Sequence, residues 1–273
     1  MPLGVRLHGW GHFRGSAIPA PRSCRLESIR IKFLFLAFAG IGHRVMVFAL
    51  KGSDGFPGMD RRWQSGAAAD LRLLVCGAGR CGTTTLAREL TATGLRCGHQ
   101  SCFTVLGIFQ PPGVEADSSW LAAPYLHAVR CPILHLVRHP LDVLNSMEGI
   151  RFLDGGITEN NCLYERFARR FLPELDALAD SRERHMRFIV SWNAAINRYT
   201  HRRMRLEDGS RESLRRHLSD LGLAPYPGTW GEKPYPFSRA NSRPRTTLTV
   251  GDLPKGSLRD EFVAQAREFG YSI

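Results

Sequence analysis

The sequence predicts an α/β fold in three layers, with a mainly parallel central sheet flanked by helices. Two short apolar runs, at 71–76 and 131–137, have the length and composition of buried strands. Stretches with helical periodicity follow each run, and the glycine-rich turn 77–82 joins the first run to the first of them. Strands that alternate with helices imply parallel neighbours joined by crossover connections.

Residues 1–70 do not share this pattern, and we expect them to form an N-terminal extension that is disordered or artefactual. They are rich in Gly, Pro and Arg and show no stable periodicity. The weak apolar stretch 33–50 is interrupted by Arg44, whose charge would cost on the order of 3 kcal/mol at the centre of a bilayer. A membrane anchor through 33–50 is the alternative, and the domain proper is expected at 71–273.

The first half of this domain contains a buried strand and the elements that follow it. The run 71–76 ends in a glycine turn, and 83–93 then carries apolar residues on one helical face until Gly94 ends it. A second short strand is expected at 95–97. The stretch 118–129 is expected to be a helix that begins with a serine cap.

The second half begins with the buried strand 131–137. A helix is expected at 140–147, because proline is tolerated in the first turn of a helix. Longer helical patterns follow at 164–179 and 182–199. The remaining predicted elements are a strand at 203–206, a short helix ending at Leu221 and a last helix at 258–269.

The chain is basic, with 37 Lys and Arg against 25 Asp and Glu and a formal net charge of +12. This balance favours polyanionic partners, namely nucleic acid, an anionic membrane or a small ligand rich in phosphate or sulfate. A nucleic-acid module would place basic and aromatic residues together on one exposed face. The sequence contains no recognised nucleic-acid motif, so we expect no nucleic-acid partner. Association with a membrane is expected only under the alternative that 33–50 anchors the chain.

The seven cysteines are odd in number and scattered, which indicates reduced thiols and a cytoplasmic protein. Cys97, His99 and Cys102 lie close together in the sequence. Their spacing matches no paired-ligand zinc pattern, and no second pair of ligands follows. We therefore expect no metal site.

The segment Gly77–Leu86, GAGRCGTTTL, places a glycine-rich turn between a buried strand and a helix. Backbone N–H groups and the helix dipole make such a turn an anion site. Its glycines and Thr84 match the nucleoside triphosphatase pattern GxxxxGK[ST], but Thr83 stands where that pattern has lysine. The cation lies earlier, at Arg80. The turn therefore suits a 5′-phosphate-like group better than a metal-bound triphosphate.

This turn resembles the 5′-phosphosulfate loop of sulfotransferases that use 3′-phosphoadenosine-5′-phosphosulfate (PAPS), whose common bacterial form reads RSGTTxL. Cys81 replaces the usual serine, which removes one hydroxyl donor. The resemblance implies that PAPS is bound by the following residues of the turn: Arg80, Cys81, Gly82, Thr83, Thr84 and Thr85.

A second motif, Ile133–Ser146, is similar to the 3′-phosphate site of the same family. The resemblance implies that Arg138 and Ser146 bind the 3′-phosphate of the donor. Arginine offers a bidentate fork to phosphate, and ligands of open parallel sheets collect at the carboxyl ends of the strands, where Arg138 lies.

Weaker similarities to bacterial members of the family extend from Leu71 to the C-terminus. Asn241–Arg243 is hypothesised to close over the donor. The segments that carry these similarities are Ser118–Pro124, Trp192–Asn193, Arg205–Asp208 and Gly251–Tyr271.

The resemblance implies a P-loop NTPase-like fold of the sulfotransferase type. The implied reaction is an in-line transfer of a sulfuryl group from PAPS to a hydroxyl or amine of a small-molecule or glycan acceptor, without a metal. Arg80 would stabilise the charge that develops on the leaving phosphate oxygen. A kinase-like nucleotide-binding protein is the main rival, and it predicts Mg²⁺-dependent ATP binding.

The catalytic base departs from the family pattern. Related enzymes carry a glutamate where this chain has Gln100, and an amide cannot accept the proton. The adjacent His99 is the candidate base, because an unperturbed imidazole titrates near pH 6.5. Asp117 or another carboxylate is a second possibility. The third is a protein that binds PAPS, or its product, without turnover.

Overall fold

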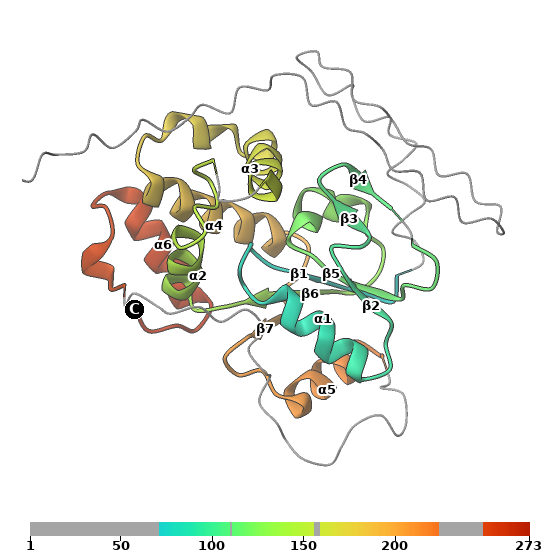
Figure 1. Cartoon of the computed structure of the whole chain (residues 1–273). Helices are drawn as coiled ribbons and strands as arrows, with labels where there is room; N and C mark the ends of the chain where they lie inside the picture. The colour runs from blue at the N-terminus through green and yellow to red at the C-terminus, as the bar shows by residue number, and fades with distance from the viewer. Residues whose placement is uncertain (1–70, 110, 156–158, 224–247) are drawn as a thin grey trace, which may run out of the picture. The chain divides into compact units, whose positions relative to one another are not determined.

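A computed structural model describes residues 71–109, 111–155, 159–223 and 248–273 (Figure 1). The chain divides into two compact units, 1–52 and 53–273, and the first lies wholly outside the described residues. The predicted extension 1–70 with its apolar stretch, and the segment Asn241–Arg243, also lie outside them.

The core of the described unit is a five-stranded, fully parallel sheet in the order β2-β5-β1-β6-β7. The central strand β1 is buried at every residue because neighbouring strands cover both of its edges and helical layers cover both of its faces. The strands are β1 (Leu73–Cys76), β2 (Cys97–His99), β5 (Ala116–Ser118), β6 (Ile133–Val137) and β7 (Arg203–Arg205).

Figure 1 shows helices on both faces of this sheet, so the predicted three-layer α/β architecture is confirmed. On one face lie α1 (Thr83–Ala92) and α5 (Arg211–Asp220). On the other lie the 3-10 segment η2 (Trp120–Ala128) and α4 (Ser181–Asn197). The other helical elements are α2 (Pro140–Glu148), α3 (Glu159–Phe171), η3 (Pro173–Ala177), η4 (Val250–Asp252) and α6 (Ser257–Glu268), with α2 and α6 packed on α4.

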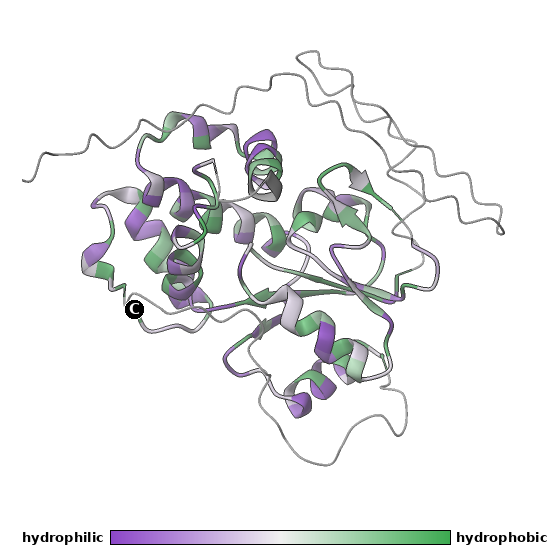
Figure 2. Cartoon of the chain, viewed as in Figure 1, coloured by the Kyte–Doolittle hydropathy of each residue, from purple (hydrophilic) through white to green (hydrophobic). Residues whose placement is uncertain are grey.

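Trp120, the first residue of η2, is buried against aromatic side chains of α3 and α4. Its ring is within 5.4–5.7 Å of five aromatic rings, and its carbonyl accepts the indole N–H of Trp192 at 2.8 Å. Figure 2 shows hydrophobic residues gathered on η2 and on the central strands. This packing fixes the layer above the sheet.

Several predicted elements need correction. The helical segment expected at 118–129, with a serine cap, is the 3-10 segment η2 capped by Ser119, while Ser118 ends strand β5. The helix expected at 164–179 ends at Phe171, because proline at the start of η3 cannot continue it. The strand expected at 95–97 begins two residues later, as β2. A small hairpin, β3 (Phe103–Thr104) and β4 (Gly107–Ile108), was not expected.

The order in which the chain adds strands to the sheet reverses between β1 and β6. These two strands are neighbours, yet the chain leaves β1 toward β2 at one edge and leaves β6 toward β7 at the other. In open α/β sheets a crevice forms at such a switch point, outside the carboxyl ends of the strands. The glycine-rich turn begins directly after β1, and Arg138 of the second motif directly follows β6, so both motifs reach this place.

Among the described residues, no helix is long and apolar enough to cross a membrane.

Candidate functional site

The glycine-rich turn leaves β1 with an unusual backbone. Arg80 has φ 69° and Gly82 has φ 105°, both in the left-handed region. For an L-residue with a side chain this conformation costs about 1–2 kcal/mol. A Cβ on Gly82 would lie 2.6 Å from a methyl group of Leu206, which follows β7. The turn is therefore packed against the end of a strand from the far edge of the sheet.

Arg80, Arg138 and Ser146 meet at the switch point. The Arg80 Nε donates to Ser146 Oγ at 3.0 Å, and Arg138 Nη1 donates to the Arg80 carbonyl at 3.1 Å. Arg138 also lies 3.6 Å from Asp142, one turn along α2. Two guanidinium groups and a hydroxyl thus converge from two motifs, which suits an anionic ligand.

Cys81 is turned inward. Its side chain is 1% exposed, and its backbone N–H donates to the Ala78 carbonyl at 3.2 Å. Burial raises the pKa of the Cys81 thiol to about 12, so it remains protonated and unreactive at neutral pH. Cys81 packs the turn and does not present its sulfur to a ligand.

The threonines at the start of α1 contact the candidate base. The hydroxyls of Thr83 and Thr84 lie 3.1 and 3.2 Å from His99 Nε2. The Thr83 carbonyl accepts a 2.9 Å hydrogen bond from Ser118 Oγ, which ties α1 to β5. Thr85, the last predicted contact, is buried in α1. The structure therefore brings His99 to the glycine-rich turn.

His99 is neutral at physiological pH in this environment. Burial lowers its pKa, and the nearby Arg88 lowers it further. A neutral imidazole can accept a proton. Gln100 adopts φ 55°, and its side-chain oxygen accepts the Tyr164 hydroxyl at 2.9 Å. The amide is thus held by α3.

Asp117 has a structural role. It is fully buried on β5, and its carboxylate accepts backbone N–H groups of Ser101, Cys102 and Phe103 at 3.1–3.4 Å. Burial raises its pKa, while these hydrogen bonds act in the opposite direction. Its oxygens hold the turn after β2, so the geometry does not favour Asp117 as an alternative base.

No group of three or more His, Cys, Asp or Glu side chains able to hold a metal ion occurs in the described part of the chain. The six described cysteines are free thiols. Cys97 donates through its thiol to the Gly98 carbonyl, and Cys102 is buried.

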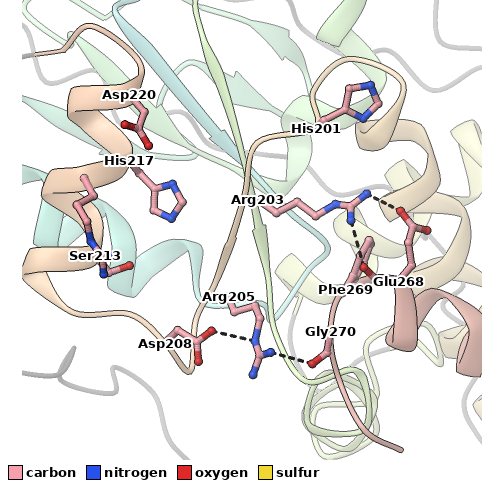
Figure 3. Close-up of a pocket in the computed structure, with 11 residues that line it drawn as sticks. His201, Arg203, Arg205, Asp208, Ser213, His217, Asp220, Glu268, Phe269 and Gly270 are labelled. Carbon is pink, nitrogen blue, oxygen red and sulfur yellow. Dashed lines mark hydrogen bonds and ion pairs between the residues drawn. The ribbon is translucent and has the colours of Figure 1, made fainter.

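A cavity of about 640 Å³ lies along β7, between α5 and the end of α6 (Figure 3). Arg203 pairs there with Glu268, and Arg205 binds Asp208 and the Gly270 carbonyl. None of the described residues that line it belongs to the predicted site. These bonds instead attach the C-terminal segment to the last strand.

Two contacts at the site were not expected from the sequence. Glu207, directly after β7, accepts the backbone N–H of His139 at 2.9 Å, and Ser118 binds the start of α1. The serine lay within a stretch expected to be helical. For Glu207, the only signal in the sequence was its place two residues after Arg205, in a segment with weak similarity to the family.

The chain matches no family model, and neither a curated protein nor a solved structure was found to match it.

Proposed function

We propose that this protein is a PAPS-dependent sulfotransferase with a P-loop NTPase-like fold. One observation carries the proposal: Arg80 contacts both Arg138 and Ser146, which are 58 and 66 residues away in the sequence. The two motifs that resemble the donor site of the family therefore form one site. Its position at the switch point of a parallel sheet, beside the start of α1, supports a nucleotide ligand.

The donor set fits a bisphosphorylated nucleotide. Arg138 and Ser146 would hold the 3′-phosphate, and Arg80 with the N–H groups that open α1 would hold the 5′-phosphosulfate. Because Arg80 and Ser146 bind each other in this structure, the donor must replace that bond with one anionic group for each partner. Thr83, at the position of the triphosphatase lysine, is 5% exposed and contacts His99. The cationic role therefore falls to the arginines.

The reaction is an in-line displacement at sulfur. A bond forms between the acceptor oxygen and sulfur while the bond between sulfur and the phosphate oxygen breaks, and the leaving group is 3′-phosphoadenosine-5′-phosphate (PAP). Arg80 stabilises the charge that develops on the leaving oxygen. His99, neutral beside the turn, takes the acceptor proton.

Calorimetric titration of the full chain tests the proposal. PAP should bind in magnesium-free buffer, and ADP, which has no 3′-phosphate, should bind at least about tenfold more weakly, a difference of about 1.4 kcal/mol. ADP and ATP are also titrated with Mg²⁺. No PAP binding, or nucleotide binding that requires Mg²⁺, would contradict the proposal, and the second result would favour a kinase-like protein.

A further inference from the structure

Glu207 links three segments around the arginine assigned to the 3′-phosphate. One carboxylate oxygen accepts the backbone N–H of His139, the residue after Arg138, at 2.9 Å. The other accepts the Tyr271 hydroxyl at 2.8 Å. The ends of β6 and β7 and the C-terminal segment therefore meet at one carboxylate.

The surrounding contacts fix this carboxylate in place. The Leu206 N–H donates to the Val137 carbonyl at 2.8 Å, which continues the pairing of β7 with β6 up to Glu207. The Tyr271 ring lies against the His139 ring at 5.2 Å, and the Arg205 guanidinium stacks over Tyr271 at 4.6 Å. Arg205 also binds the Gly270 carbonyl (Figure 3).

The charge of Glu207 alone would oppose an anionic ligand. Glu207 and Arg138 both act on the buried Cys81 thiol of the glycine-rich turn, the carboxylate raising its pKa and the guanidinium lowering it. A negative charge that reaches the turn electrostatically repels phosphate. An advantage of Glu207 for ligand binding must therefore come from the hydrogen bonds it accepts.

We propose that Glu207 is a positioning residue: with Tyr271 it holds the turn at 138–139 so that Arg138 faces the 3′-phosphate of the donor. This inference rests on the proposed function. The Glu207 side chain has two opposite effects on donor affinity. Its hydrogen bond to the His139 N–H favours binding of the 3′-phosphate, while its negative charge opposes it. Gln at this position keeps an acceptor oxygen without the charge, and Ala keeps neither.

The test measures the affinities of the full chain for PAP and for 5′-AMP, which differ by the 3′-phosphate. Glu207→Ala should raise the Kd for PAP about fivefold or more and change that for 5′-AMP less than about twofold, because the loss acts through Arg138. Glu207→Gln should bind PAP at least as tightly as the wild type. Tyr271→Phe, which removes one bond to the carboxylate, should weaken PAP binding about two- to threefold. A purely structural role would not alter the preference for PAP over 5′-AMP.

Glu261→Ala is the matched control, because this carboxylate on α6 pairs with Arg187 and should leave both affinities unchanged. If Glu207→Ala binds PAP as tightly as Glu207→Gln while the wild type prefers PAP to 5′-AMP, the role of Glu207 is wrong and the proposed function stands. If Glu207→Ala fails to fold, unchanged PAP affinity of Tyr271→Phe overturns the inference. A wild type without preference for PAP overturns both proposals.

Discussion

At the scale of single residues, Arg80 combines a strained backbone with the central contacts of the site. Its φ of 69° persists because neighbours hold both ends of the residue: Ser146 accepts from the guanidinium, and Arg138 binds the carbonyl. Residues held in such conformations cluster at active sites and ligand-binding sites. The strain is consistent with Arg80 being selected for binding rather than for stability.

Two truncations of Arg80 separate strain from function. Arg80→Gly and Arg80→Ala both remove the guanidinium, so both should lose PAP affinity. Only glycine adopts a positive φ without penalty, so Arg80→Gly should be about 1 kcal/mol more stable to urea than Arg80→Ala. Equal free energies of unfolding would show that the turn relaxes in the alanine variant and that the strain is not imposed by the fold.

At the scale of elements, the turn between β1 and α1 depends on a close approach at Gly77. A Cβ there would lie 2.2 Å from the Leu136 carbonyl oxygen and 2.5 Å from Cys81 Sγ. Strand β6 is paired with β1 and β7, and Cys81 is buried, so both neighbours are confined by close packing.

Gly77→Ala should therefore destabilise the protein by about 3 kcal/mol and weaken PAP binding, because overpacking a rigid site displaces backbone. Gly251→Ala is the control, since its Cβ would meet only a side-chain oxygen at 3.5 Å and should change the free energy of unfolding by less than about 0.5 kcal/mol. Thermal unfolding with PAP titration measures both. A Gly77→Ala variant as stable as the control would refute the close approach.

The elements also show which parts of the fold a sequence can predict. The strands β1 and β6 and helix α1 follow from apolar runs and a glycine turn, and all three were predicted. Strand β5 was missed because it is only three residues long and contains a charged residue, Asp117. The burial of this carboxylate depends on hydrogen bonds from the backbone N–H groups of the turn after β2, which the local sequence does not reveal.

The site divides in the same way. Local motifs contain Arg80, Arg138 and Ser146, so these residues could be predicted from the sequence. In the structure, Arg80 contacts both of the others. Glu207 and Ser118 reach the site through contacts that span 68 and 35 residues, which no local pattern encodes. The contact of His99 with Thr83 and Thr84 depends on which face of the sheet the His99 side chain occupies. Successive side chains of a strand point to opposite faces, but a strand as short as β2 carries too little hydrophobic alternation to show which face is which.

At the scale of the whole molecule, buried histidines make stability depend on pH. His185 is fully buried on α4, and its Nε2 accepts the Leu153 N–H at 3.3 Å, so the neutral ring is the bonded form. Burial lowers the pKa of His185, and burial lowers the pKa of His135 to about 4. Between pH 6.5 and these lowered values the unfolded chain binds protons that the folded chain does not.

Stability should therefore be highest above about pH 6.5 and fall as the pH drops toward 4. His185→Gln removes one titrating group while keeping a side-chain acceptor, so the slope of unfolding free energy against pH should decrease by up to about 1.4 kcal/mol per pH unit. Urea unfolding at several pH values measures this slope, to which His135 still contributes. A slope identical to that of the wild type would exclude His185 from the acid response.

The central claim is that Arg138, at the switch point, binds the 3′-phosphate of the donor. The most direct measurement is a calorimetric cycle of four affinities, those of the wild type and Arg138→Ala for PAP and for 5′-AMP. A coupling of about 2 kcal/mol between the arginine and the 3′-phosphate is predicted, the strength of a charge-assisted hydrogen bond. If the two losses add to within about 0.5 kcal/mol, Arg138 does not contact that phosphate and the account of the donor site is wrong.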